Sequence, residues 1–277
     1  MKRILFPIAF CLLAGLTAAA QCLPTRTDGV EPYQAGESLV MSVSYNWHAV
    51  QTDVARGTLS IKQETLNGEK VWHSKMTAVT ASFFDVFFKI RERFESWFAL
   101  KGEDPRKFIR DTYEGGYIAT NLYLYDKAAK VIHADVHRGD NAPVTLDIPY
   151  GDCTYDLTTL LYFVRRLDMS RIVVGKTYKE SFAVDESVRQ LALTFRGREK
   201  KYLKGVGTVN TLKFSIAVHT SNVFEGGQAY LWLSDDDNRI PVAFSAPLKV
   251  GAMNGRLVSY EGLAHDFSAL ISTKRVK

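Results

Sequence analysis

The sequence lacks the compositional bias that marks disordered, collagenous or coiled-coil proteins. Hydrophobic residues make up 46% of its 277 positions, aromatic residues 12% and charged residues 23%. This balance predicts a globular protein with a buried core, organised as one large domain or two modest ones.

Long hydrophobic runs are absent beyond Leu16, so we expect no transmembrane segment in the rest of the chain. The one apolar run spans 13 residues, from Ile4 to Leu16, and lies between the basic pair Lys2-Arg3 and three alanines at 18–20. It is too short for a bilayer core, which needs roughly 20 helical residues. Basic, apolar and small residues in this order predict a signal peptide, 1–20, and an exported, periplasmic protein that begins at Gln21.

Cysteine is scarce. Cys11 would leave with the signal peptide, and Cys22 and Cys153 would remain. In an oxidising compartment these two could form one disulfide, and two unpaired thiols are the alternative. A further alternative is a lipoprotein anchored through Cys22, which follows a leucine-containing apolar run, although Gln21 stands where a small residue normally precedes a lipidated cysteine.

A strong excess of charge of one sign is also missing. The formal net charge is +5, and removal of Lys2 and Arg3 with the signal peptide would lower it to +3. A dedicated nucleic-acid binder would concentrate basic residues on one face, so we expect no nucleic-acid partner.

Period-two alternation of apolar and polar residues runs through most of the chain and predicts half-buried strands. Met41, Val43, Tyr45 and Trp47 share one side of the first strand, and Asn67-Gly68 supplies the positive φ angles of a type I′ hairpin. The further predicted strands are 58–63, 70–80, 86–98, 108–113, 117–125, 131–138, 144–148, 176–184, 191–196, 207–219, 228–234, 239–245 and 255–260.

One segment, at about 156–167, breaks this alternation and predicts a helix. Its apolar residues recur at the i, i+3, i+4, i+7 spacing of a single helical face, and Asp156 or Thr154 can cap its first turn. The predicted buried face consists of Leu157, Leu160, Leu161 and Val164.

About a dozen strands with one helix predict an all-β fold, mainly antiparallel, in the form of an open barrel or a sandwich; an α+β fold is the alternative. Residues 21–32 are expected to form an N-terminal tether. Residues 33–267 are expected to form a single large β domain, in which the helix joins two meanders, 33–150 and 172–267.

Several segments carry a family resemblance. The most specific is the hairpin 231–242, LWLSDDDNRIPV, and the helix start 155–162 reads YDLTTLLY; GESL at 36–39, VGKTY at 174–178 and KVG at 249–251 accompany them. Together they resemble the bacterial exported family called domain of unknown function 3108, over most of residues 33–265. The resemblance implies an exported, β-rich envelope protein and brings no assigned reaction. By architecture alone, the expected fold is also similar to half-barrel proteins that shelter lipid or lipoprotein acyl chains in the periplasm.

Candidate metal ligands are few. His133, Asp135 and His137 project from one face of a predicted strand, and two imidazoles with a carboxylate could hold zinc. The residues between them are apolar, which favours an ordinary solvent-facing strand. The oxygen-rich run 235–238 lacks the spaced ligands and distal glutamate of an EF-hand loop and predicts a hairpin turn. We expect no metal and no cofactor.

Catalytic motifs are missing as well. The Gly175-Lys176-Thr177 tripeptide resembles the end of a phosphate-binding loop, but Ser170 replaces the required earlier glycine. The sequence contains no His-Glu-x-x-His and no Gly-x-Ser-x-Gly. A noncatalytic role is therefore the favoured interpretation.

A basic run near residue 200 offers a weak candidate for lipid phosphates or acidic glycans, although charge runs usually face water. We expect it to form a solvated hairpin tip. Its members are Arg196, Arg198, Lys200, Lys201 and Lys204.

Aromatic residues point to a ligand site. One helix cannot cover a dozen strands, so we predict a cavity or groove in the curved sheet, lined by strand aromatics. The candidate ligand-binding residues are Tyr45, Trp47, Phe88, Phe94, Phe98 and Trp232.

Three functional hypotheses follow. The first is an exported, noncatalytic binding or envelope-maintenance protein whose sheet shelters a lipid or another apolar small molecule. The second is an assembly protein that docks another envelope protein through a sheet edge or an apolar face. The third is a glycan or lipid hydrolase, because dispersed residues can converge in space.

Overall fold

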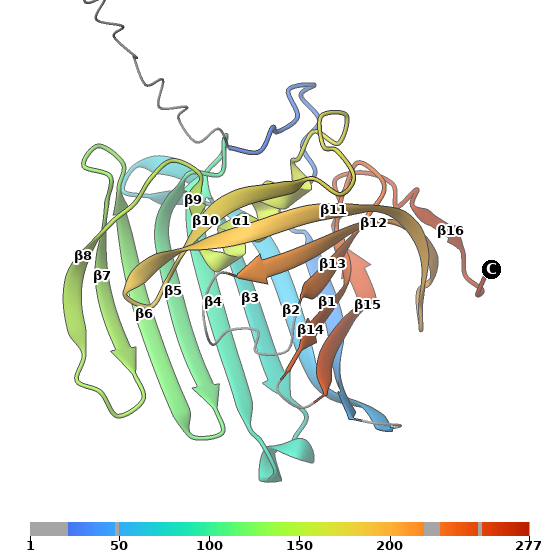
Figure 1. Cartoon of the computed structure of the whole chain (residues 1–277), viewed down its shortest axis with the longest axis horizontal. Coiled ribbons are helices and arrows are strands. Elements are labelled where there is room, and N and C mark those ends of the chain that lie inside the picture. Colours follow the sequence, from blue (N-terminus) through green and yellow to red (C-terminus); the bar gives the residue numbers. More distant parts are fainter. Residues whose placement is uncertain (1–21, 48–49, 219–227, 249–250, 277) are drawn as a thin grey trace, which may run out of the picture.

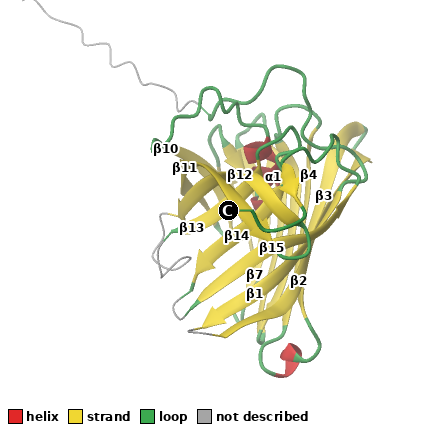
Figure 2. Ribbon diagram, turned by 90° about the vertical axis from the view of Figure 1, so that its right-hand side faces the viewer, coloured by secondary structure: helices red, strands yellow, loops and turns green. Residues whose placement is uncertain are grey.

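The computed structural model describes residues 22–47, 50–218, 228–248 and 251–276; the expected signal peptide, 1–20, lies outside them. Within these residues, sixteen strands form one sheet that curls around an α-helix (Figures 1 and 2). The predicted all-β class with one mid-chain helix is confirmed. In the described part of the chain, no helix is both long and apolar enough to cross a membrane.

The first half of the chain is an antiparallel meander in which each strand pairs with the next. Its tight turns use the residues that positive φ angles require: Asn67 and Gly68 have φ angles of 50° and 86°. The strands are β1 (Ser38–Trp47), β2 (Val50–Leu66), β3 (Glu69–Thr80), β4 (Ile90–Ala99), β5 (Pro105–Glu114), β6 (Tyr117–Asp126), β7 (Val131–Arg138) and β8 (Val144–Pro149).

The second half continues the same sheet, because β15 pairs with β1 and so joins the two meanders side by side. All its pairs are antiparallel except the short parallel pair of β9 with β10, and β16 adds to β12. The strands are β9 (Thr154–Tyr155), β10 (Thr177–Val184), β11 (Ser187–Leu203), β12 (Gly207–Val218), β13 (Ala229–Ser234), β14 (Pro241–Pro247), β15 (Ala252–Glu261) and β16 (Leu270–Ser272).

The two edge strands of the sheet, β8 and β9, are consecutive in the chain. Only residues 150–153 connect them, and no ladder joins the two edges within the described residues. The sheet nevertheless curls back on itself, since Ile148 of β8 shares a buried apolar cluster with Ala183 of β10 and Val188 of β11. The interior is thus enclosed by a sheet with one open seam.

Helix α1 (Leu157–Arg165) lies inside the curl, near one end of it (Figure 2). Asp156 caps it as predicted, accepting hydrogen bonds from the backbone N–H groups of Thr158 and Thr159 at 3.0 and 2.8 Å. The expected buried leucine face is only partly correct. Val164 is buried, but the three leucines are half-buried, and the most buried side chains include Tyr162 and Arg165. The reason is that α1 is covered on two sides, with Tyr162 packed on β4 and Phe163 stacked on Tyr155 of β9.

Arg165 fastens α1 to two distant segments. Its guanidinium makes a bidentate ion pair with Glu37, with N–O distances of 2.6 and 2.7 Å, and both side chains are at most 1% exposed. It also donates to the backbone carbonyls of Pro32 and Asn238. A fully buried charge is tolerated here because each of the three guanidinium nitrogens meets an acceptor.

Two local expectations are wrong. The predicted strand 86–98 begins only at Ile90, and the residues before it form an exposed turn with a short 3-10 helix, η1 (Phe84–Val86). Most of the basic run at 196–204 lies along a strand, because β11 extends to Leu203, and only Lys204 stands in the expected hairpin turn. Along the strand, Arg198 pairs with Asp235, and the ammonium of Lys201 lies 3.6 Å from the ring centroid of Trp232.

The segment 22–32, expected as a tether, lies against the body of the protein. Cys22 forms a disulfide with Cys153, next to β9, with a Cα–Cα distance of 5.2 Å. Leu23 is 4% exposed, and the N–H of Arg26 donates to the carbonyl of Arg166 at 2.7 Å. The disulfide therefore lies at the seam between the two sheet edges.

Candidate functional site: an apolar groove inside the curved sheet

The concave face of the sheet is not filled. Two spaces of about 700 and about 270 Å³ adjoin there, and Ile90 and Met253 line both. The larger space opens at the end of the sheet where η1 lies, and the smaller reaches Leu161 of α1. We call the two together the groove. Its total size is in the range of small-molecule binding sites.

Strand alternation makes the groove apolar. Met41, Val43 and Tyr45 of β1 point into it because successive side chains of a strand face opposite sides. The remaining apolar lining comes from six other strands, the η1 turn, α1 and the β14–β15 turn, through Val54, Ala55, Leu59, Met76, Ala78, Phe84, Phe87, Phe88, Ile90, Phe94, Leu161, Leu231, Phe244, Leu248 and Met253.

Two glycines shape the wall. Gly57 lies opposite Met41 in the β1–β2 ladder, and a Cβ atom added there would be 3.5 Å from its nearest neighbour, an ordinary contact. The space beside Gly57 thus belongs to the groove. At Gly255, an added Cβ would lie 2.0 Å from Cε1 of Phe244, so this glycine lets the aromatic ring lie flat on β15.

The mouth of the groove is edged by the turn 81–89, whose backbone is internally bonded. The N–H groups of Phe87 and Phe88 both donate to the carbonyl of Phe84 at 2.9 Å. Asp85 is paired with Arg91 and accepts from the hydroxyl of Thr80, and these bonds lower the pKa of Asp85 to about 2. The turn is therefore a built feature that keeps its aromatic side chains at the opening.

A polar border limits the groove on the side of β4 and β5. Glu92 lines the inner space, and its carboxylate accepts from the hydroxyl of Thr112 at 2.6 Å. Burial raises the pKa of Glu92 to about 7 against the effect of that hydrogen bond, and the nearby Glu114 raises it further. Beyond it, Arg110 pairs with Asp185 at 2.9 Å. An amphipathic ligand would meet apolar walls first and titratable or charged groups at this border.

Only some of the predicted aromatic residues meet in the groove. Tyr45, Phe88 and Phe94 line it, while the side chain of Trp47 lies outside the described residues. Phe98 is fully buried against Tyr162 in the core.

Trp232 lies on the opposite face from the groove, since it is Leu231 that lines the cavity. Its indole N–H donates to Glu199 at 2.6 Å, and the ammonium of Lys201 lies 3.6 Å from the ring centroid. Trp232 therefore packs on the convex face of the sheet and does not line the groove.

Sequence reasoning missed the turn residues of the groove, Phe84 and Phe87. Their signal was present in the run Phe83-Phe84-Asp85-Val86-Phe87-Phe88, whose doubled phenylalanines do not fit a period of two. Extending the β4 pattern back to Val86 concealed it.

The metal candidates do not converge. His133 pairs with Asp147 at 2.7 Å, and Asp135 accepts from Thr145 at 2.6 Å, both on the exposed side of the β7–β8 pair. Among the described residues, no three His, Cys, Asp or Glu side chains are grouped so that they could hold a metal ion.

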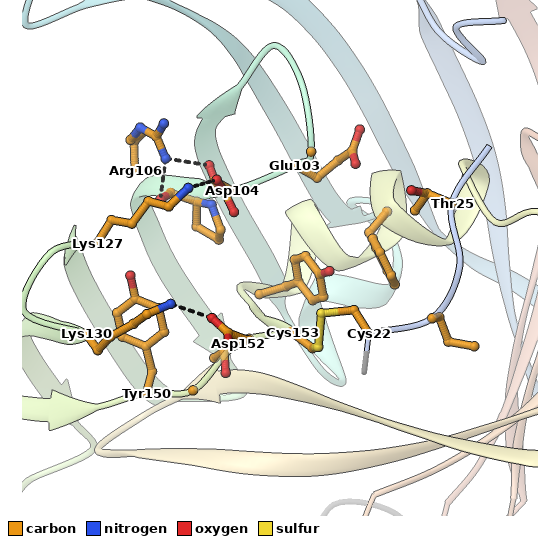
Figure 3. Close-up of a pocket in the computed structure, with 17 residues that line it drawn as sticks. Cys22, Thr25, Glu103, Asp104, Arg106, Lys127, Lys130, Tyr150, Asp152 and Cys153 are labelled. Atoms are coloured by element: carbon orange, nitrogen blue, oxygen red, sulfur yellow. Dashed lines mark hydrogen bonds and ion pairs between the residues drawn. A yellow bond between two sulfur atoms is a disulfide. The ribbon is translucent and has the colours of Figure 1, made fainter. Parts of the chain in front are cut away.

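A second cavity, of about 300 Å³, lies beside the disulfide at the seam (Figure 3). Its charged groups pair within the protein, Lys127 with Asp104 and Lys130 with Asp152 (Figure 3). Burial raises the pKa of Glu103 there to about 7, opposed by the adjacent Arg166. Because these charges already have partners, this cavity offers a ligand less than the groove does.

Comparisons with known proteins agree with the fold. A β-barrel-like protein of domain of unknown function DUF1849 from Brucella abortus has a TM-score of 0.56 at 12% identity, over 83% of this chain and 98% of the other. A candidate lipoprotein from Parabacteroides distasonis (13% identity, 87% and 100% coverage) and a candidate exported protein with a YmcC-like fold from Bacteroides fragilis (8%, 87% and 100%) have TM-scores of 0.39 and 0.37, too low to bear on the fold.

Among curated proteins, no sequence matches this one. The profile of one family, described as protein of unknown function (DUF3108), matches residues 41–258. That match spans most of the chain and includes the strands that build the groove, and the chain therefore belongs to the DUF3108 family.

Proposed function

We propose that this protein is an exported, noncatalytic binding protein that holds an apolar chain, such as the acyl chain of a lipid, in the groove. The observation that carries the proposal is a pair of adjoining apolar spaces on the concave face of the sheet, which share Ile90 and Met253 in their walls and reach Leu161 of α1. Burying a ligand against such walls releases water from apolar surface on both partners, which is the main driving force for binding apolar chains.

Two observations support export. The first is the signal-peptide pattern of residues 1–20, and the second is the Cys22–Cys153 disulfide, a bond that persists in oxidising compartments. A sulfur engaged in that disulfide cannot also carry a lipid, so we favour a periplasmic protein without an anchor at Cys22. Mass spectrometry of the protein from its own host is expected to find Gln21 at the amino terminus and no lipid on Cys22. An intact Met1 or an acylated Cys22 would contradict this.

The ligand itself can be identified from protein purified from its own host. We expect native mass spectrometry and lipid extraction to find a co-purifying acyl compound. A stoichiometric protein partner without lipid would favour the assembly hypothesis instead.

A substitution inside the groove tests the site. Gly57→Leu should fill the inner space without straining the backbone, and we expect it to weaken binding of a soluble fluorescent fatty acid by about tenfold or more, since a blocked cavity forfeits the buried contact area. Fluorescence titration measures this.

The matched control is Ser60→Leu, which puts the same side chain on another residue of β2, one that faces the other side of the sheet and does not line the groove. It should bind the fatty acid as the unaltered protein does. Equal binding by the Gly57→Leu variant, with its fold intact by circular dichroism, would overturn the groove as the binding site.

A further inference from the structure

The turn 81–89 exposes more apolar surface than its position in the sheet requires. Phe83 is 71% exposed, Val86 84% and Phe87 76%. Soluble proteins rarely leave such large apolar side chains grouped in water unless the group meets an apolar partner.

The exposed side chains stand at the mouth of the groove. Figure 2 places η1 at the end of the sheet away from α1, and Phe87 both lines the groove and faces the solvent. Phe88 extends the patch sideways, since its ring lies where a Cβ of Gly115, in the β5–β6 turn, would be. Tyr117, 42% exposed, follows that turn. We call Phe83, Val86, Phe87, Phe88 and Tyr117 the rim.

The chemistry of the rim suits a bilayer. The turn has one acidic side chain, Asp85, which Arg91 already neutralises, and the N–H groups of Phe84, Phe87 and Phe88 are bonded within the turn. Few unmet hydrogen bonds would therefore accompany transfer into a lipid surface. Tyr117 at the edge, and Lys89, whose ammonium lies 5.5 Å from the ring centroid of Tyr113, suit the zone between acyl chains and headgroups.

We propose that the rim inserts into the surface of a lipid bilayer, so that an acyl chain passes between the bilayer and the groove without crossing water. This inference rests on the proposed function, because it takes the groove to be the place where the acyl chain is bound. We infer a lipid as the partner because the rim adjoins an apolar groove, with Phe87 and Phe88 common to both, and because it offers almost no unpaired charge. Attraction to phosphatidylcholine, which has no net charge, should therefore suffice, with little dependence on salt.

Vesicle flotation tests the inference, with the processed protein purified from its own host. We expect it to float with phosphatidylcholine vesicles, and the Phe83→Ser/Phe87→Ser variant to lose about tenfold or more of that partition, because two exposed rings no longer enter the bilayer. The matched control is Val173→Ser/Val174→Ser. These valines, 58% and 61% exposed, lie in the loop between α1 and β10. This control should float normally.

A second variant gives a positive signal. In Phe87→Trp, brominated phosphatidylcholine should quench the added tryptophan emission more than it quenches the unaltered protein. Equal quenching, or equal flotation of the Phe83→Ser/Phe87→Ser variant, would overturn membrane insertion. So would self-association of the unaltered protein that this variant abolishes, since the rim would then be an interface between copies.

Uptake of the soluble fluorescent fatty acid, measured on the same samples, separates the two proposals. Fatty-acid binding without flotation would refute the rim inference and leave the groove function standing. Flotation that depends on Phe83 and Phe87 but is not accompanied by fatty-acid binding would support the rim and refute the groove.

Discussion

A buried carboxyl group, that of Glu180, predicts that the stability of this protein depends on pH. Glu180 is 2% exposed, accepts a hydrogen bond from the N–H of Leu23 at 2.7 Å, and has a second carboxylate oxygen without a partner among the described residues. Burial raises its pKa from 4.5 to about 7. The folded protein therefore binds this proton more tightly than the unfolded chain does.

The sign of the pH dependence follows. The contribution of Glu180 to stability is fully present below about pH 4.5 and is lost as the pH rises to about 7, because the buried carboxylate is then charged. We expect Glu180→Gln to raise the free energy of unfolding by about 1–2 kcal/mol near pH 8 and to change it little near pH 4. Denaturant titrations at both pH values measure the difference. The exposed Glu261→Gln serves as the control, and an equal effect of Glu180→Gln at the two pH values would contradict the assignment.

At the scale of single residues, sequence reasoning succeeded where local chemistry decides the outcome. Asn67-Gly68 and the Asp156 cap were predictable because turns and caps depend on neighbouring atoms. Arg165 was interpretable only as a cation near a helix end. Its pairing with Glu37, 128 positions away, depends on the complete fold.

Among the elements, α1 depends on that pair. We expect Arg165→Met to lower the free energy of unfolding by about 3–5 kcal/mol, because it leaves the Glu37 carboxylate buried without its partner and two backbone carbonyls without a donor. Urea denaturation measures the loss. Arg171→Met, at an exposed position beyond the helix, should change stability by no more than about 0.5 kcal/mol.

A double variant isolates the charge effect. Adding Glu37→Gln to Arg165→Met removes the unpaired carboxylate and should restore part of the lost stability. If the double variant were less stable than Arg165→Met by the full cost of Glu37→Gln alone, the two side chains would not be coupled.

The elements also show where periodicity misleads. The strands 117–125 and 131–138 were placed to within a residue, because uninterrupted alternation identifies a half-buried strand. The groove mouth was missed because aromatic residues of an exposed turn resemble those of a strand face. The extent of β11 was missed because charged residues that pair across the convex face resemble those of a solvated loop.

For the whole molecule, the disulfide is the strongest covalent constraint beyond the backbone. Cys22 and Cys153 are separated by 131 positions, so the bond restricts a long stretch of the unfolded chain. We expect the double Cys22→Ser/Cys153→Ser variant to be less stable by about 2–4 kcal/mol in denaturant titrations. Reductant should destabilise the unaltered protein to a similar degree and leave the variant unchanged; an effect on both would assign it to something other than the disulfide.

The four-residue connection between the edge strands limits how the whole sheet can deform. Five Cα–Cα steps separate Pro149 from Thr154, so the backbone holds these two points within about 18 Å however far the seam opens. At the other end of β8, side-chain ion pairs join the turn to β7 with the β10–β11 hairpin among the described residues: Arg138 pairs with Glu186 at 3.0 Å and with Asp185 at 3.6 Å, and such pairs can open where a backbone cannot. Expansion of the barrel must therefore be wedge-shaped, hinged beside the disulfide and widest at the groove mouth, so that a bulky guest would be admitted by a tilt of the edges with α1 left in place.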